Sequence, residues 1–308
     1  MLFTGCANPA ASLPSGVSAA AWSRATIGDV LFISDGSGYV YVYEYPSLTY
    51  VTKYAVLDSP SGLCADQVGH VFVPQNAEYF KSGWILELAR GYVRPIRMIP
   101  DPGAQPLDCA VDPTTQNLAV TSYSGLGPGE PGSVAIFAGF MRVYTDPDLF
   151  FYGFCTYDPT GDLFVDGQDV NLNPVLAELP KDGNALVTLN VQGLPPSFGY
   201  PAGLAWSGDS LLLGDLDHDV IYELRLSGTG ATVTGSIKLR GGHGVEQFTI
   251  FDRGGHATLI GPNSFDTSVG LWPYPRGGKP SRTITGIGAF GSVITKGSPQ
   301  RSRTRGPR

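Results

Sequence analysis

The chain alternates apolar and polar residues in short runs, and one such run recurs at a nearly constant spacing. A typical copy is Cys109-Ala-Val-Asp112-Pro-Thr-Thr-Gln-Asn-Leu-Ala-Val120, in which a small residue precedes an aspartate-bearing turn and a strand. A period near 45 residues with four short strands per unit predicts an all-β fold, a six-bladed β-propeller. The copies begin at Cys64, Cys109, Cys155, Ala205 and Phe248, with steps of 45, 46, 50 and 43 residues.

Alternation and turns divide each unit into four strands. In the third unit we expect strands at residues 107–111, 117–121, 133–137 and 141–144. The first unit starts with a second-strand pattern at residues 29–34. One further step of 45 residues from Phe248 reaches Val293, in a spare strand at residues 291–295. Pairing these two strands would close the ring with a strand from each end and leave no exposed sheet edge.

The repeat predicts one domain with two flanking segments. Residues 1–21 read as a signal remnant and tether, residues 22–295 as the propeller, and residues 296–308 as a disordered tail without apolar residues. The tail holds five positive charges and no acid, so the rest has 15 basic against 27 acidic residues. This acidic body argues against a nucleic-acid partner, because phosphate binding needs a basic face. We expect no transmembrane segment and a monomer.

The N-terminus resembles the end of a bacterial lipoprotein signal, in which a small residue precedes a lipidated cysteine. Thr4-Gly5-Cys6 fits that pattern, but the charged and apolar regions of a signal are missing. Two alternatives stay open, a lipid anchor at Cys6 or an unprocessed N-terminus. We expect an extracytoplasmic bacterial protein, either periplasmic, anchored to the outer membrane or secreted.

Three cysteines start three of the repeats. Cys109 and Cys155 stand three residues before their turn aspartates, whereas Cys64 stands two before Asp66, which turns it to the opposite sheet face. Cys64 and Cys109, on adjacent innermost strands, could therefore face each other. Two alternatives remain: a disulfide between them, or small side chains that fit where the blades converge.

Further short phrases along the chain are Ser34-Asp35, Tyr39-Val-Tyr-Val-Tyr43, Cys109-Ala-Val-Asp-Pro-Thr-Thr, Gly161-Asp-Leu-Phe-Val-Asp-Gly167 and Trp272-Pro-Tyr-Pro275. With these phrases the chain resembles NHL-type six-bladed propellers, especially uncharacterised bacterial secreted or lipoprotein propellers. The likeness spans about residues 27–295. It implies the fold and no agreed activity, since a shared fold does not carry function across. More distant relatives by fold include gluconolactonase-like metal hydrolases and streptogramin lyases.

Polar residues gather in the loops that join second to third strands, which should share one face with the starts of the first strands. Asp215-Leu-Asp217-His218-Asp219 has carboxylates at alternate positions, like the first half of a calcium loop. Calcium or magnesium would suit such oxygen ligands. Alternatively, Asp and Asn in tight loops cap their own backbone. The candidate ligand-binding residues are Asp35, Asn76, Tyr123, Asp166, Asp169, His218, His243, Asn263 and Asp266, and the candidate metal ligands are Asp215, Asp217 and Asp219.

Two functions follow from this face. The first is a non-catalytic exported scaffold that binds a protein or glycan ligand, with loop aromatics such as Tyr123, Phe198 and Tyr200 as anchors. The second is a metal-dependent hydrolase or lyase, for which His218 and His243 with Asp217 would be an acid–base group. No catalytic motif selects the second, so the scaffold is the leading hypothesis and no cofactor other than calcium or magnesium is expected.

Overall fold

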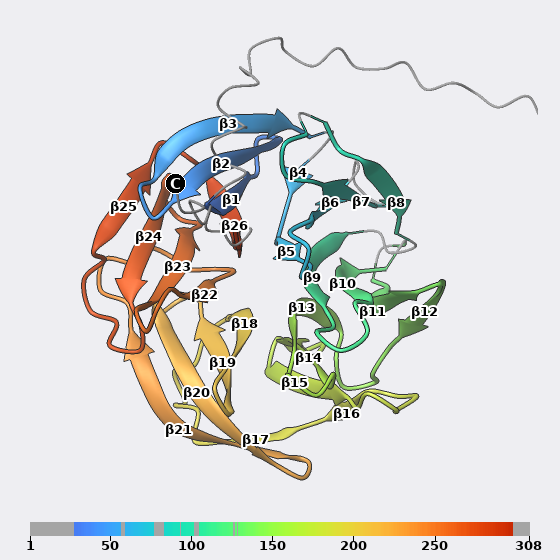
Figure 1. Cartoon of the computed structure of the whole chain (residues 1–308). Coiled ribbons are helices and arrows are strands. Elements are labelled where there is room, and N and C mark those ends of the chain that lie inside the picture. The colour runs from blue at the N-terminus through green and yellow to red at the C-terminus, as the bar shows by residue number, and fades with distance from the viewer. Residues whose placement is uncertain are drawn as a thin grey trace, which may run out of the picture.

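A computed structural model describes residues 28–56, 59–76, 83–92, 94–101, 105–125, 127 and 129–297. Six sheets of four or five strands stand around a central axis, and Figure 1 looks along that axis. The predicted all-β, six-bladed propeller is confirmed. Within the described residues, no helix is long and apolar enough to cross a membrane.

The six blades are numbered here in chain order, and each runs from an innermost first strand to an outer fourth strand. Blade 1 contains β26 (Ala289–Thr295), β1 (Asp29–Asp35), β2 (Tyr39–Tyr45) and β3 (Thr49–Ala55); blade 2 contains β4 (Ser59–Pro60) and β5 (Cys64–Ala65), then β6 (Val71–Asn76), β7 (Trp84–Leu88) and β8 (Arg97–Pro100); blade 3 contains β9 (Pro106–Val111), β10 (Leu118–Ser124), β11 (Pro131–Ala138) and β12 (Phe140–Tyr144). Blade 4 contains β13 (Phe151–Tyr157), β14 (Leu163–Gln168), β15 (Pro174–Leu179) and β16 (Val187–Thr188); blade 5 contains β18 (Pro201–Ser207), β19 (Ser210–Asp215), β20 (Val220–Ser227) and β21 (Gly230–Lys238); blade 6 contains β22 (Thr249–Asp252), β23 (Ala257–Asn263), β24 (Ser268–Pro273) and β25 (Arg282–Thr285).

The ring closes as the sequence predicts. The C-terminal strand β26 pairs antiparallel with β1, in a register that sets Val30 opposite Thr295 and Phe32 opposite Val293. Blade 1 is therefore built from both ends of the described chain, and Figure 1 shows β26 beside β1 at the centre of the ring. This pairing covers the edge that each strand would otherwise expose.

The second strands are buried on both faces, which explains their continuous apolar runs. On β1, Phe32 packs in a cluster with residues of blade 2 such as Leu86, whereas Leu31 packs in a cluster with residues of blade 6 such as Ile260. Successive side chains of a strand point to opposite faces, so one strand fills the spaces on both sides of its blade. The core is thus a ring of inter-blade layers rather than one central cluster.

Two features of the fold go beyond the predicted four strands per blade: a fifth strand in blade 5 and a disulfide between two blades. Blade 5 has a fifth strand, β17 (Asn190–Gln192), which pairs parallel with the outer edge of β21. Cys64 and Cys109 form a disulfide between blades 2 and 3, with their Cα atoms 5.5 Å apart, so the first of the two open alternatives is found. Cys155 is a buried free thiol. Cys6 lies outside the described residues.

Candidate functional site

The candidate site is a depression at the axis, on the loop-rich face. We define this face by the connections between second and third strands and by the segments that lead into the first strands. The depression has a volume of about 260 Å³. Five of the six blades line it, so it is a product of ring closure. Its lining residues are Ser59, Pro60, Ser61, Gln105, Pro106, Leu107, Tyr123, Tyr200, Glu246 and Phe290.

Aromatic side chains form much of the wall around one carboxyl group. Tyr123, at the end of β10, stacks on Phe151 with ring centroids 4.9 Å apart. Burial raises the pKa of the Tyr200 phenol, and the neighbouring Tyr123 and Glu246 add to the rise. Burial also raises the pKa of Glu246 to about 8, partly opposed by a hydrogen bond with Ser264. Glu246 is therefore largely neutral at pH 7 when no cation lies beside its carboxyl group.

The loop from Asp215 to Asp219 holds the two segments that carry this wall. Asp217 Oδ2 accepts a hydrogen bond of 3.1 Å from the backbone N–H of Tyr200. Asp219 Oδ1 accepts hydrogen bonds from the N–H groups of Gly244 and Val245, directly before Glu246. The motif that resembles half a calcium loop thus positions Tyr200 and Glu246.

The three carboxylates of that loop do not point at one centre. Asp215 is buried and lies 3.1 Å from His218 Nδ1, whereas Asp217 and Asp219 bond to the separate backbone segments just described. His218 thus pairs with Asp215 rather than with Asp217. Within the described residues, no three His, Cys, Asp or Glu side chains are grouped as metal ligands. A calcium or magnesium ion at this loop stays a prediction.

Most other predicted site residues bond to their own loops. Asp35 and Asp169 each cap the backbone two residues ahead, at 2.7 and 2.8 Å. The Asn263 side chain accepts a bond from the His243 backbone and donates to Ser268, which also donates to Asp266. For Asn76 the structure gives the backbone pairing with Ser59 only. Of the nine ligand-binding candidates, Tyr123 alone is among the residues lining the depression.

Beneath the depression, one side chain joins blades across the axis. Gln247 Nε2 donates to Leu63 O at 2.8 Å and to Asp108 Oδ1 at 2.7 Å. Its Oε1 accepts from Leu63 N at 3.1 Å and from Ser292 N at 2.9 Å. Cys155 N donates to Asp108 Oδ2 at 3.0 Å. These bonds connect blades 1, 2, 3, 4 and 6, and Asp108 and Gln247 directly follow the lining residues Leu107 and Glu246 in the chain.

Two fully buried carboxyl groups belong to this inner layer. Burial raises the pKa of Asp108 to about 7, although bonds from Cys155, Cys109 and Gln247 oppose the rise. Burial raises the pKa of Asp166 well above its usual range. Asp166 Oδ1 accepts a bond of 2.6 Å from Phe154 N, while its Oδ2 has no hydrogen-bond partner within the described part of the chain. Asp166 is therefore an inner-layer residue and not a surface ligand.

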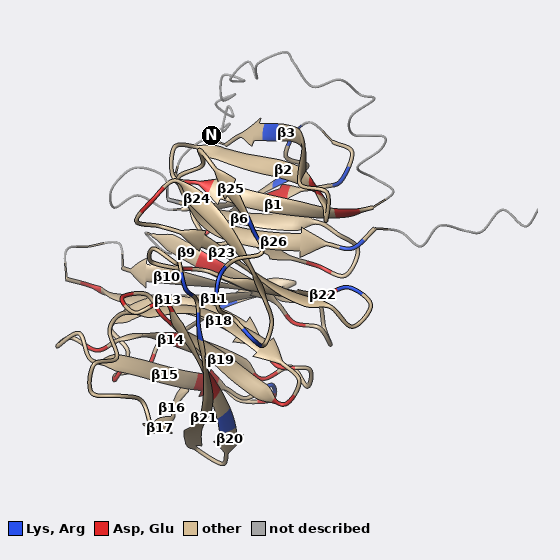
Figure 2. Cartoon of the chain, turned by 90° about the vertical axis from the view of Figure 1, so that its left-hand side faces the viewer, with Lys and Arg blue, Asp and Glu red and all other residues tan. Residues whose placement is uncertain are grey.

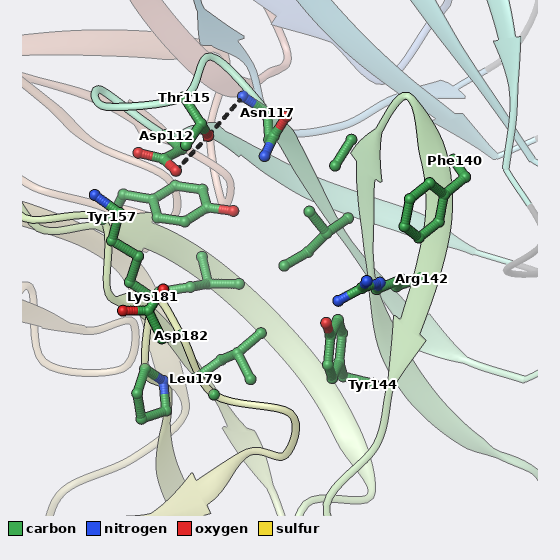
Figure 3. Close-up of a pocket in the computed structure, with 16 residues that line it drawn as sticks. Asp112, Thr115, Asn117, Phe140, Arg142, Tyr144, Tyr157, Leu179, Lys181 and Asp182 are labelled. Carbon is green, nitrogen blue, oxygen red and sulfur yellow. Dashed lines mark hydrogen bonds between the residues drawn. The ribbon is translucent and has the colours of Figure 1, made fainter.

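A second hollow lies away from the axis, between the outer parts of blades 3 and 4, and is drawn in Figure 3. Its volume is about 310 Å³. Arg142 lies over the Phe140 ring, 4.8 Å from its centroid, and the Asp112 carboxylate accepts hydrogen bonds from its own turn at Thr114 and Thr115. Only two blades form this hollow and it is not on the loop-rich face, so we take the axial depression as the candidate site.

Sequence reasoning missed the central residues, although the repeat contains a signal for them. Two positions before each repeat start, four units have glycine, at positions 62, 153, 203 and 291, whereas the third unit has Leu107 and the sixth has Glu246. One position before each start, two units have a large polar residue, Asp108 and Gln247. The other four units have Leu63, Phe154, Leu204 and Ser292 there. Comparing repeats position by position would have selected the carboxyl group of the depression and the pair beneath it.

Comparison with solved structures supports the fold. A chain of the nidogen/laminin complex superposes with a TM-score of 0.65 at 19% identity, covering 87% of this chain and 98% of that one. Hydrazine synthase of Kuenenia stuttgartiensis gives 0.61 at 16% identity, with 80% of each chain covered. A protein of unknown function from Bacteroides caccae gives 0.61 at 12% identity, covering 87% and 98%.

These identities are low, and the similarity is one of fold alone. No protein-family model matches the chain, and no curated protein matches it in sequence. The chain is a six-bladed β-propeller, similar in architecture to propellers from proteins with different names and sources.

Proposed function

We propose that this protein is a non-catalytic binding propeller that takes a protein or glycan ligand on its loop-rich face, over the axial depression. The observation that carries the proposal is the depression itself, which has a volume of about 260 Å³ and lies on a face where five blades meet. Concave sites with aromatic walls and few polar groups are the usual form of ligand sites in proteins. Loops on a rigid scaffold are also where binding residues concentrate.

The inner hydrogen bonds support a binding role over a catalytic one. The carboxylates of the Asp215–Asp219 loop are engaged with backbone N–H groups and with His218, so they act as positioning groups for Tyr200 and Glu246. Such a preformed wall lowers the ordering cost of binding. Metal-dependent hydrolysis or lysis at this face remains the alternative from sequence.

The experiment is a blocking substitution, read on peptide and glycan arrays. Ser59 is an exposed residue on the rim, so Ser59→Trp should fill the mouth of the depression without disturbing the core. The matched control is Thr229→Trp, at an exposed turn between β20 and β21. We expect the full chain and Thr229→Trp to share a set of array ligands that Ser59→Trp loses. Binding that survives in Ser59→Trp, or no array ligand at all, would overturn the proposal.

We further infer that the protein works outside the cytoplasm and is related to NHL-type propellers. The disulfide between Cys64 and Cys109 supports export, because disulfides persist mainly in oxidising compartments. The repeated aspartate-turn phrase supports the NHL-like relation. A lipid anchor at Cys6 is tested by mass spectrometry of the N-terminal peptide from the native host. An unmodified, uncleaved N-terminus would rule out the anchor.

A further inference from the structure

The lining of the axial depression selects a particular kind of ligand group. Three aromatic rings, those of Tyr123, Tyr200 and Phe290, reach it from blades 3, 5 and 1. Pro60, Pro106 and Leu107 add apolar surface, and Glu246 supplies the one carboxyl group of the lining, which contains no Lys, Arg or His. Aromatic faces attract cations through their ring quadrupoles, and a carboxyl group complements the same charge. The wall therefore combines the two elements that bind an ammonium group.

The surroundings of the depression carry acidic charge. The connections that form the loop-rich face include Asp169, Asp217, Asp219 and Asp266. Among the described residues of those connections, Arg240 is the sole Lys or Arg. Figure 2 marks the acidic residues in red along the strand ends and loops. A mouth with this balance concentrates cationic ligands and speeds their approach.

The same lining favours a lysine side chain over an amino sugar. A lysine has an apolar stem of four carbons below its charge, so the stem can lie along aromatic and aliphatic walls while the ammonium group reaches a carboxyl. A sugar ring would bury hydroxyls against Pro60, Pro106 and Phe290, whose side chains have no hydrogen-bond donor or acceptor. The volume of about 260 Å³ lies just below the roughly 300 Å³ at which sites for drug-sized ligands begin, which also suits a single side chain.

We propose that the axial depression binds a lysine side chain from an exposed, basic segment of a partner protein, with the ammonium group against Glu246 and the stem between Tyr123, Tyr200 and Phe290. This inference rests on the proposed function, because it names the group that the bound ligand inserts. Glu246 is the specificity-determining residue, and Asp217 and Asp219 are positioning residues that hold the segments on which Tyr200 and Glu246 stand.

The test is a cycle of two changes, one in the peptide and one in the protein. A fluorescent peptide with a central lysine is compared with the same peptide carrying norleucine, which keeps the stem and removes the charge. Each is titrated to millimolar concentration against the full chain, Glu246→Gln and Glu130→Gln. Glu130 is an exposed glutamate on the same face, so its variant is the matched control.

We expect norleucine and Glu246→Gln each to weaken binding about tenfold, and Glu246→Gln to leave norleucine binding unchanged, because both changes remove one charge pair. Glu130→Gln should bind like the full chain. Equal binding of the two peptides to the full chain would overturn the inference even if Glu246→Gln failed to fold. Retained array binding with no dependence on lysine would overturn the inference alone and leave the proposed function standing. Selective binding of glucosamine-bearing glycans through Glu246 would replace lysine with an amino sugar.

Discussion

Replacement of Gln247 by leucine tests whether the bonds across the axis hold the ring together. Gln247 is 6% exposed, and leucine fills a similar volume without the amide. The change removes the partner of Leu63 N, Leu63 O, Ser292 N and Asp108 Oδ1 at once. These four groups come from blades 1, 2 and 3, so the loss falls on three blades together.

The size of the effect follows from those four groups. A buried polar group that loses its partner costs about 1–3 kcal/mol of stability. A hollow on the other side of the network reaches Gln247, so water can enter and partly replace the amide, and we take the lower end. The expected loss is about 4 kcal/mol in the free energy of unfolding. At about 2–4 °C per kcal/mol for a chain of 150–250 residues, the melting temperature should fall by about 10 °C.

The assay is calorimetry of the full chain, Gln247→Leu and the control Gln192→Leu. Gln192 is exposed on β17, so its replacement should change stability by no more than about 0.5 kcal/mol. A Gln247→Leu protein that melts at the temperature of the full chain, as the control should, would show that the network is not needed for stability. An equal fall in melting temperature in Gln247→Leu and Gln192→Leu would attribute the loss of stability to the introduced leucine rather than to the lost hydrogen bonds.

Four further outcomes follow from the structure. Deletion of the residues after Phe290 should abolish cooperative unfolding, because it removes most of the closing strand β26. Deletion of residues 298–308 should leave the melting temperature unchanged, and a stable protein after the longer deletion would contradict ring closure. Reduction of the Cys64–Cys109 disulfide, which spans 45 residues, should cost about 4 kcal/mol in a denaturant titration, and unchanged midpoints would contradict that value. Because the pKa of Asp108 rises from 3.8 to about 7 on folding, its contribution to stability is full below pH 4 and is lost as pH rises through 7. Melting temperatures measured over that range check this, and Asp108→Asn should make the melting temperature depend less on pH. If the Asp215–Asp219 loop binds calcium or magnesium, elemental mass spectrometry should find near-stoichiometric metal and a chelator should lower the melting temperature; a metal-free protein with an unchanged melt would end the enzyme alternative.

The strands could be predicted because their pattern is local and repeated. The predicted residues 291–295 and 29–34 fall within β26 and β1, and their pairing follows from the count of repeats. The fifth strand β17 could not be found in this way. It lies in the connection between blades 4 and 5 and pairs with β21 in parallel, a contact that no alternation pattern within the segment specifies.

The site was predicted at the level of a face and not of its residues. The sequence leaves Asp215, Asp217 and Asp219 as either metal ligands or backbone caps, and the loop geometry turns them to His218 and to two different backbone segments. The bond between Gln247 and Asp108 joins residues 139 positions apart, so no local pattern could specify it. Alternation also shows that Cys64 and Cys109 can face each other, but it does not give the spacing of their blades.

The two kinds of buried acid at the axis should respond to pH in opposite ways. Asp108 stabilises the ring while it is protonated, so its contribution falls as pH rises through about 7. Glu246 needs its negative charge to hold an ammonium group, so affinity for a lysine peptide should rise as pH approaches its pKa of about 8. Binding at pH 7 should therefore release a proton from Glu246, which calorimetry in buffers of different ionisation enthalpy can count. Since Glu246→Gln removes the proton release while Asp108 keeps its effect on melting, one variant separates recognition at the depression from stability of the layer beneath it.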